Sequence, residues 1–253
     1  MTRSALHRWA SWLACVAVLA PVHSQAPSIQ QAQPFETFHL GVEWRLVRAG
    51  SAVLTRTPRP GGGWQSDLHI ESAGLVSKLF RVNDAYRSQY DSGFCTANTL
   101  LRAEEGKRRR ETVVTFHHDT KKSSYLERDT IRNAIVMQKE LDVPPCVQDV
   151  VAALSRLRAT KLAPGQSTQF PISDGKRMAM VKIEAQEKET LKTPAGIFQA
   201  MRYEAHLFND VLYVRKGRLF VWLTDDERKL LVQIRVKLSF PVGTISLQLE
   251  KIG

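Results

Sequence analysis

The sequence lacks the short motifs that identify common enzyme classes, and it contains few cysteines and aromatic residues. Only three of its 253 residues are cysteine, and 8% are aromatic. It has no H-E-x-x-H zinc motif and no G-x-S-x-G nucleophile motif. Its run of three glycines, at residues 61–63, is not followed by the Lys-Ser/Thr pair of a phosphate-binding loop. We therefore expect no cofactor, and the sequence does not indicate an enzyme.

The sequence also lacks any apolar run long enough for a permanent transmembrane helix, which needs about 20 residues. The apolar run at residues 12–20 follows two arginines, Arg3 and Arg8, and precedes the small-residue pattern that ends at Ser24. This arrangement is typical of a signal peptide over residues 1–24, cleaved after Ser24. It predicts a periplasmic or secreted protein that is not an integral membrane protein after processing. Lipidation at Cys15 and an uncleaved anchor are the two alternatives.

Acidic residues are in the minority. The chain has 36 lysines and arginines against 25 aspartates and glutamates, a formal net charge of +11. Outside the cytoplasm, the anionic partners of a basic protein are lipid headgroups, acidic glycans and other envelope polymers, so we expect no nucleic-acid partner. Solubility without a specific partner is the alternative explanation.

The cysteine count becomes even once the signal peptide is removed, which leaves Cys95 and Cys146. Exported proteins fold under oxidising conditions, where an even number of cysteines is typical of disulfide bonding. We predict a Cys95–Cys146 disulfide, with two separate buried thiols as the alternative.

Alternating apolar and polar residues dominate the chain from Phe35 onward. Short alternating runs separated by turn residues are typical of antiparallel strands, and we place the first hairpin turn at Ala49-Gly50. One segment, residues 145–158, has helical spacing instead. The pattern predicts an all-β fold with one main helix: a curved antiparallel sheet, an incomplete barrel or a sandwich. We expect a flexible leader over residues 25–34 and a single domain over residues 35–253.

Two groups of residues are weak candidates for binding. Trp222, Asp225 and Asp226 form an acidic cluster beside an aromatic residue, which can contact a sugar, although aspartates at this point are also typical of a turn. The second group is basic, and its members are candidates for anion binding or for a solvated edge strand: Arg108, Arg110, Lys121 and Lys122.

A metal site is not predicted. His117-His118-Asp119 is the most suggestive cluster, but consecutive residues of a strand point to opposite faces, so both histidines do not readily bind one ion.

Several segments resemble the bacterial domain-of-unknown-function family 3108, over nearly all of residues 40–249. The most distinctive is residues 217–226, Gly-Arg-Leu-Phe-Val-Trp-Leu-Thr-Asp-Asp; others lie at residues 41–44, 79–84, 105–108, 149–158 and 194–200. The resemblance implies an exported, mostly β envelope protein with no established activity, and it supplies no site residues.

The sequence best fits a non-catalytic binding or structural module for an apolar or amphipathic envelope molecule, such as a lipid or a glycolipid. One alternative is a hydrolase or glycan-active enzyme that uses Asp225 and Asp226. Another is a module that binds a protein partner through a free sheet edge. The oligomeric state and the strand order are not predicted.

Overall fold

The computed structural model describes residues 35–253. The predicted signal peptide and leader, including Cys15 and Ser24, lie outside the described residues. Neither helix in this range has the length and apolar character that a membrane-spanning helix needs.

The described chain forms fourteen strands and two helices. In order, these are β1 (Glu36–Trp44), β2 (Val47–Pro58), β3 (Trp64–Ser72), α1 (Gly74–Leu79), β4 (Val82–Tyr90), β5 (Thr96–Glu105), β6 (Arg108–His117), β7 (Lys122–Asp129), β8 (Ala134–Asp142), α2 (Val150–Ala159), β9 (Ser167–Ser173), β10 (Met178–Thr193), β11 (Gly196–Ala205), β12 (Gly217–Thr224), β13 (Leu231–Leu238) and β14 (Thr244–Ile252).

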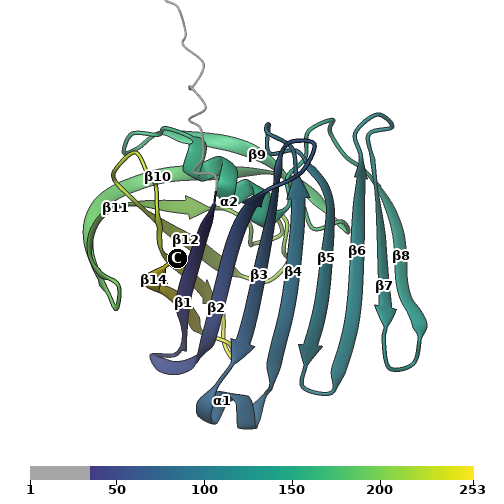
Figure 1. Cartoon of the computed structure of the whole chain (residues 1–253), viewed down its shortest axis with the longest axis horizontal. Helices are drawn as coiled ribbons and strands as arrows, with labels where there is room; N and C mark the ends of the chain where they lie inside the picture. The colour runs from purple at the N-terminus through teal and green to yellow at the C-terminus, as the bar shows by residue number, and fades with distance from the viewer. Residues whose placement is uncertain (1–34) are drawn as a thin grey trace, which may run out of the picture.

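All of these strands belong to one antiparallel sheet with the order β8-β7-β6-β5-β4-β3-β2-β1-β14-β13-β12-β11-β10-β9. Strands that are neighbours in sequence pair with each other, except β8 and β9, which form the two edges of the sheet, and β1 also pairs with β14. The sheet curls so that β9–β14 lie behind β1–β5, and α2 lies across its open top (Figure 1). The all-β prediction is confirmed, and the architecture is a curved sheet and not a sandwich of two sheets.

A short extended segment closes the curled sheet beside α2. The Thr96 N–H donates to the Val147 carbonyl at 2.9 Å, which ties this segment to the start of β5. The Gln148 N–H donates to the Pro171 carbonyl at 2.9 Å, which ties it to β9. The edge of β9 is thereby covered at this point, whereas β8 ends the sheet at the other side.

The helix begins later than the sequence predicted, at Val150 and not at residue 145. Val147 and Gln148 use their backbone groups to bond the neighbouring strands, and Asp149 adopts the extended backbone of an N-cap. These tertiary contacts override the helical spacing of the apolar residues.

The first hairpin turn also differs from the prediction. It lies at Arg45 and Leu46, which both have positive φ, at 49° and 68°. Gly50 lies inside β2, where a Cβ atom would come within 2.0 Å of the Glu71 carbonyl oxygen. This glycine is required by the close approach of β3 and not by a turn.

The main core lies on the concave side of the sheet, beneath α2. Its largest fully buried members include Phe38, Leu40, Phe170, Met201 and Tyr203. A smaller cluster covers the convex face of β11–β13 around Phe220 and Trp222.

Candidate functional site

An apolar cavity lies between α2 and the concave face of the sheet. Its volume is about 180 Å³, and all the residues that line it are Leu, Ile, Val or Ala. Val151, Leu154 and Leu157 contribute from the helix. Strands from both halves of the sheet supply the facing walls.

The chemistry of this lining fits a hydrocarbon. A cavity of about 150 Å³ lined by aliphatic and aromatic side chains stays free of water and admits a molecule such as benzene. The lining presents no polar side chain to hydrogen-bond a ligand, so the cavity suits an apolar group.

The N-terminus of α2 is held by a buried carboxylate. Asp149 is 2% exposed, and its Oδ1 accepts the Val151 N–H at 2.7 Å and the Ala152 N–H at 3.3 Å. Its Oδ2 accepts hydrogen bonds from the hydroxyls of Ser88 on β4 and Thr96 on β5. Asp149 therefore caps the helix and joins it to two strands.

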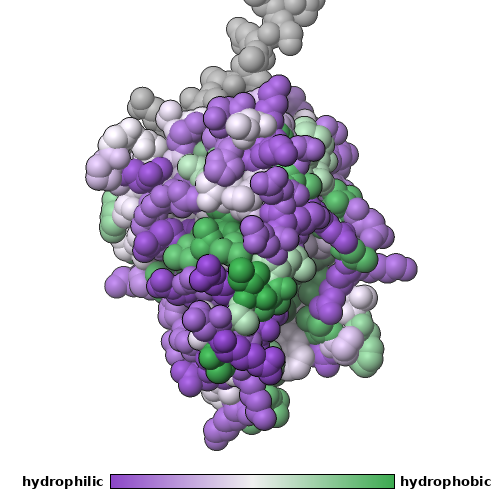
Figure 2. Space-filling view, turned by 90° about the vertical axis from the view of Figure 1, so that its right-hand side faces the viewer, coloured by the Kyte–Doolittle hydropathy of each residue, from purple (hydrophilic) through white to green (hydrophobic). Residues whose placement is uncertain are grey.

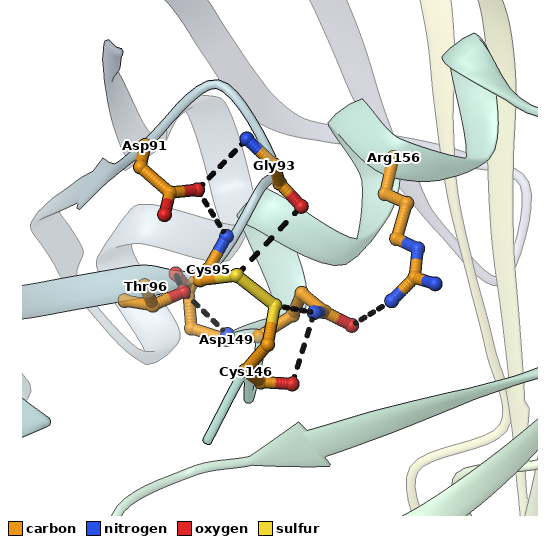
Figure 3. Close-up of a disulfide and its surroundings, with 8 residues drawn as sticks. Asp91, Gly93, Cys95, Thr96, Cys146, Asp149 and Arg156 are labelled. Carbon is orange, nitrogen blue, oxygen red and sulfur yellow. Dashed lines mark hydrogen bonds between the residues drawn. A yellow bond between two sulfur atoms is a disulfide. The ribbon is translucent and has the colours of Figure 1, made fainter. Parts of the chain in front are cut away.

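A disulfide holds the same end of the helix. Cys95, just before β5, is bonded to Cys146, just before the segment that leads into α2 (Figure 3). The Asp91 carboxylate orders the loop on the Cys95 side by accepting the N–H groups of Gly93 and Cys95, at 2.8 and 2.9 Å. The predicted pairing is therefore present in the structure.

The C-terminal end of α2 is held by a buried ion pair. Arg158 Nη2 donates to Glu36 Oε1 on β1 at 3.0 Å, and Arg158 Nε donates to the Lys229 carbonyl at 2.7 Å. The side chains of Arg158 and Glu36 are only 9% and 5% exposed. Both ends of α2 are therefore bonded to strands, and the helix covers the cavity.

The structure does not place the predicted ligand-binding residues at this cavity. Trp222 is 3% exposed, and its indole N–H donates to Glu189 Oε1 at 2.6 Å. Asp226 Oδ1 accepts from the Thr224 hydroxyl at 2.6 Å and from the backbone N–H groups of residues 228 and 229, and Asp225 pairs with Lys188 at 2.7 Å. Trp222 lies on β12, and Asp226 bonds the backbone of the connection between β12 and β13, so a role in glycan contact or hydrolysis stays a hypothesis.

The predicted anion-binding residues lie around β6 and β7, and the acids of neighbouring strands pair with three of them. Arg108 pairs with Glu127 at 3.0 Å. Arg110 pairs with Asp129 and Glu127. Lys122 lies 3.6 Å from Glu140, while Lys121 occupies the β6–β7 turn with a φ of 57°. Anion binding here stays a prediction, and it would compete with these pairs.

Within residues 35–253, no group of three or more His, Cys, Asp or Glu side chains is arranged to hold a metal ion.

Sequence reasoning did not identify the residues that line the cavity. Leucine and valine at alternate strand positions predict a core face, but this pattern is the same whether the opposing space is filled or empty. The only signal in the sequence was the apolar stripe of α2, which correctly predicted a helix packed against the sheet.

A family model described as "Protein of unknown function (DUF3108)" matches residues 40–250. The chain belongs to this family. No curated protein matches it. Membership of DUF3108 confirms the resemblance seen in the sequence and supplies no activity.

The DUF3108 fold has a solved counterpart in the β-barrel-like protein of domain of unknown function DUF1849 from Brucella abortus. The two share 8% identity with a TM-score of 0.59, over 88% of this chain and 98% of that one. A DUF1089 family protein from Pseudomonas aeruginosa gives a TM-score of 0.34 at 11% identity, over 84% of this chain and 95% of that one. The first likeness supports the barrel-like fold alone.

Proposed function

We propose that this protein is a non-catalytic binding protein of the bacterial envelope, which holds an apolar or amphipathic molecule between α2 and its curved sheet. The observation that carries the proposal is the wholly aliphatic lining of a 180 Å³ cavity. A filled core would be more stable, because each unfilled volume forfeits packing contacts. An open space kept under a firmly anchored helix is therefore best explained by an occupant.

Filling the cavity tests this function. Ala153 is buried on α2 and faces the cavity, so Ala153→Phe places a ring in the space that a ligand needs. Benzene and octane derivatives should raise the melting temperature of the wild-type protein through binding to the native state, and should raise that of this variant much less. Ala195→Phe, an exposed change in the β10–β11 turn, is the matched control and should respond as wild type.

A second cavity-filling substitution keeps the test valid if Ala153→Phe does not fold. Ile234→Phe approaches the same cavity from β13 and should also weaken binding. The proposal fails if wild-type protein binds none of these apolar probes, or if both filled variants bind them as wild type does.

We further propose that the protein is exported and that its mature chain begins at Gln25. The support is the signal-peptide pattern of residues 1–24. N-terminal sequencing of the protein from a periplasmic extract should read Gln25 first. An intact chain beginning at Met1 in the cytosol would contradict this.

The free edge at β8 supports a second candidate function, pairing with a second copy of this chain. Apolar side chains gather near the centre of the molecular face that carries β8 (Figure 2). On β8 itself, Ile135, Val136 and Met137 are 58%, 46% and 42% exposed. In an antiparallel pair of β8 strands centred on Val136, Ile135 of each copy can lie opposite Met137 of the other, which is a favourable cross-strand arrangement of two exposed apolar side chains.

Sedimentation over a range of protein concentrations tests this candidate. Wild-type protein should form a dimer as concentration rises, and Val136→Lys should shift it towards monomer. Val113→Lys, on the interior strand β6, is a control with a similarly exposed valine and should leave the dimer intact. A wild-type protein that stays monomeric throughout would rule out this pairing.

A further inference from the structure

A second space adjoins the apolar cavity at the N-terminal end of α2. Its volume is about 210 Å³. Apolar side chains, among them Leu101, Val114 and Phe116, line it together with six that bear hydroxyl groups: Tyr86, Thr99, Thr112, Tyr125, Ser173 and Tyr213. Val150, in the first turn of α2, lines both spaces and is 37% exposed.

The register of the sheet explains why the two spaces adjoin. One inward-facing row crosses neighbouring strands from Leu54 to Leu68, Tyr86, Leu101 and Thr112. The first two members line the apolar cavity, and the last three line the second space. The first hydroxyl of this row is therefore that of Tyr86 on β4, which pairs directly with Leu68 on β3, and Leu101 is the apolar member of the part that lines the second space.

The charges that line the second space offset one another. Lys176 and Asp174 lie together in the β9–β10 turn, where Asp174 Oδ1 accepts the N–H groups of Lys176 and Arg177, each at 2.8 Å. The Lys176 ammonium lies 5.1 Å from the centroid of the Tyr125 ring. This balance of one cation and one anion favours a neutral ligand group over a charged one.

The tyrosine hydroxyls of this space stay protonated at physiological pH. Burial raises the pKa of Tyr213 to about 12, with the Asp174 and Asp149 carboxylates adding to the effect. Burial and the Asp149 carboxylate also raise the pKa of Tyr86 well above its ordinary value. The Tyr86 hydroxyl already bonds the side chains of Asp149 and Thr99. The Tyr213 hydroxyl can both donate and accept a hydrogen bond, which is the pattern that a sugar or glycerol hydroxyl matches.

We propose that the ligand is an amphiphile with a hydrocarbon tail and an uncharged, hydroxyl-bearing headgroup, such as a sugar or a glycerol. The tail lies in the apolar cavity and the headgroup contacts Tyr213 and Lys176 in the second space. This inference rests on the proposed binding function and adds the headgroup site and the chemical class of the ligand.

Probes that share one tail and differ in the headgroup test the proposal. Octyl glucoside, octanoate and octyltrimethylammonium, each below its micelle concentration, are titrated into the protein by calorimetry, with benzene as a probe for the tail site alone. We expect octyl glucoside to bind at least about tenfold more tightly than either charged probe. Equal or tighter binding of a charged probe would overturn the proposal.

A tyrosine variant locates the headgroup. Tyr213→Phe should weaken octyl glucoside about fivefold, the effect of losing one hydrogen bond, and should leave benzene binding unchanged. The matched control is Tyr203→Phe, which removes a fully buried hydroxyl from a residue that lines neither space, and it should bind both probes as wild type does.

The outcomes separate the two proposals. If benzene binds but Tyr213→Phe leaves octyl glucoside unchanged, the headgroup site is wrong and the binding function stands. If neither benzene nor any octyl probe binds wild-type protein, the binding function itself fails.

Discussion

At the scale of single residues, Asp149 fixes the N-terminal end of α2. Its carboxylate caps the helix and accepts the buried hydroxyls of Ser88 and Thr96. Loss of an N-cap costs about 1 kcal/mol, and buried hydroxyls left without an acceptor cost about 1–3 kcal/mol more. We predict that Asp149→Ala lowers the free energy of unfolding by about 2–4 kcal/mol, measured by urea denaturation.

The control for this change is Asp142→Ala, at an exposed aspartate on β8, which should alter stability by less than about 0.5 kcal/mol. Equal stability of the two variants would show that Asp149 does not hold the helix.

A second residue-scale effect is the dependence of stability on pH at Glu204. Hydrogen bonds from Arg218, at 2.6 and 2.7 Å, lower the pKa of this buried carboxyl group despite the opposing effect of burial. A carboxyl whose pKa is lower in the folded protein stabilises it above the unfolded-state pKa, and this contribution is lost as pH falls through the folded-state pKa.

We therefore predict that Glu204→Gln destabilises the protein at about pH 7 and that the difference from wild type is smaller at about pH 3, because the unfolded-state carboxyl is then mostly protonated and part of the contribution is lost. Urea denaturation at both pH values measures this. A difference that is the same at both would contradict the prediction.

At the scale of elements, the disulfide stabilises the segment that leads into α2. Its cysteines are 51 residues apart, a loop for which the chain-entropy estimate is about 4 kcal/mol. We predict that Cys95→Ser with Cys146→Ser lowers the free energy of unfolding by about this amount. Hydrogen exchange should also become faster at the N–H groups of Thr96 and Gln148, which tie the segment to the strands.

The reduced wild-type protein is the control, because it loses the same bond without any substitution. If reduction and the double substitution both leave stability unchanged, the disulfide does not hold this region.

The elements also show how far the sequence alone could be interpreted. Period-2 alternation depends only on which face of a strand is buried, so it predicted the strands and the curved sheet. The predicted position of the first turn, at Ala49-Gly50, was wrong. Glycine is typical of turns, but Gly50 is needed here because β3 approaches too closely for a Cβ atom. The predicted start of α2 was too early because the strand contacts of Val147 and Gln148 depend on segments distant in sequence.

The candidate site could not be predicted from the sequence for a related reason. The same pattern of apolar residues lines a filled core and an empty cavity, and only the distances between elements distinguish the two. The change from Leu68 to Tyr86 across β3 and β4 has meaning only once their register is known.

At the scale of the whole molecule, the two halves of the sheet are connected through β1 and β14. Arg158 adds a connection, because it binds Glu36 on β1 and the Lys229 carbonyl beside β13. The main core is also shared, since its members come from β1 and β2 as well as from β9–β14. Neither half can bury its apolar face without the other, which supports the proposal of a single domain over residues 35–253.

We predict that the mature protein unfolds in one cooperative transition. Tryptophan fluorescence reports on both halves, because Trp44 and Trp64 lie in the first and Trp222 in the second. Its urea midpoint should coincide with that of far-ultraviolet circular dichroism, the expected behaviour of a two-state domain. Two separated midpoints would instead mean that the β1–β8 and β9–β14 halves fold independently, and the cavity would then lie between two domains.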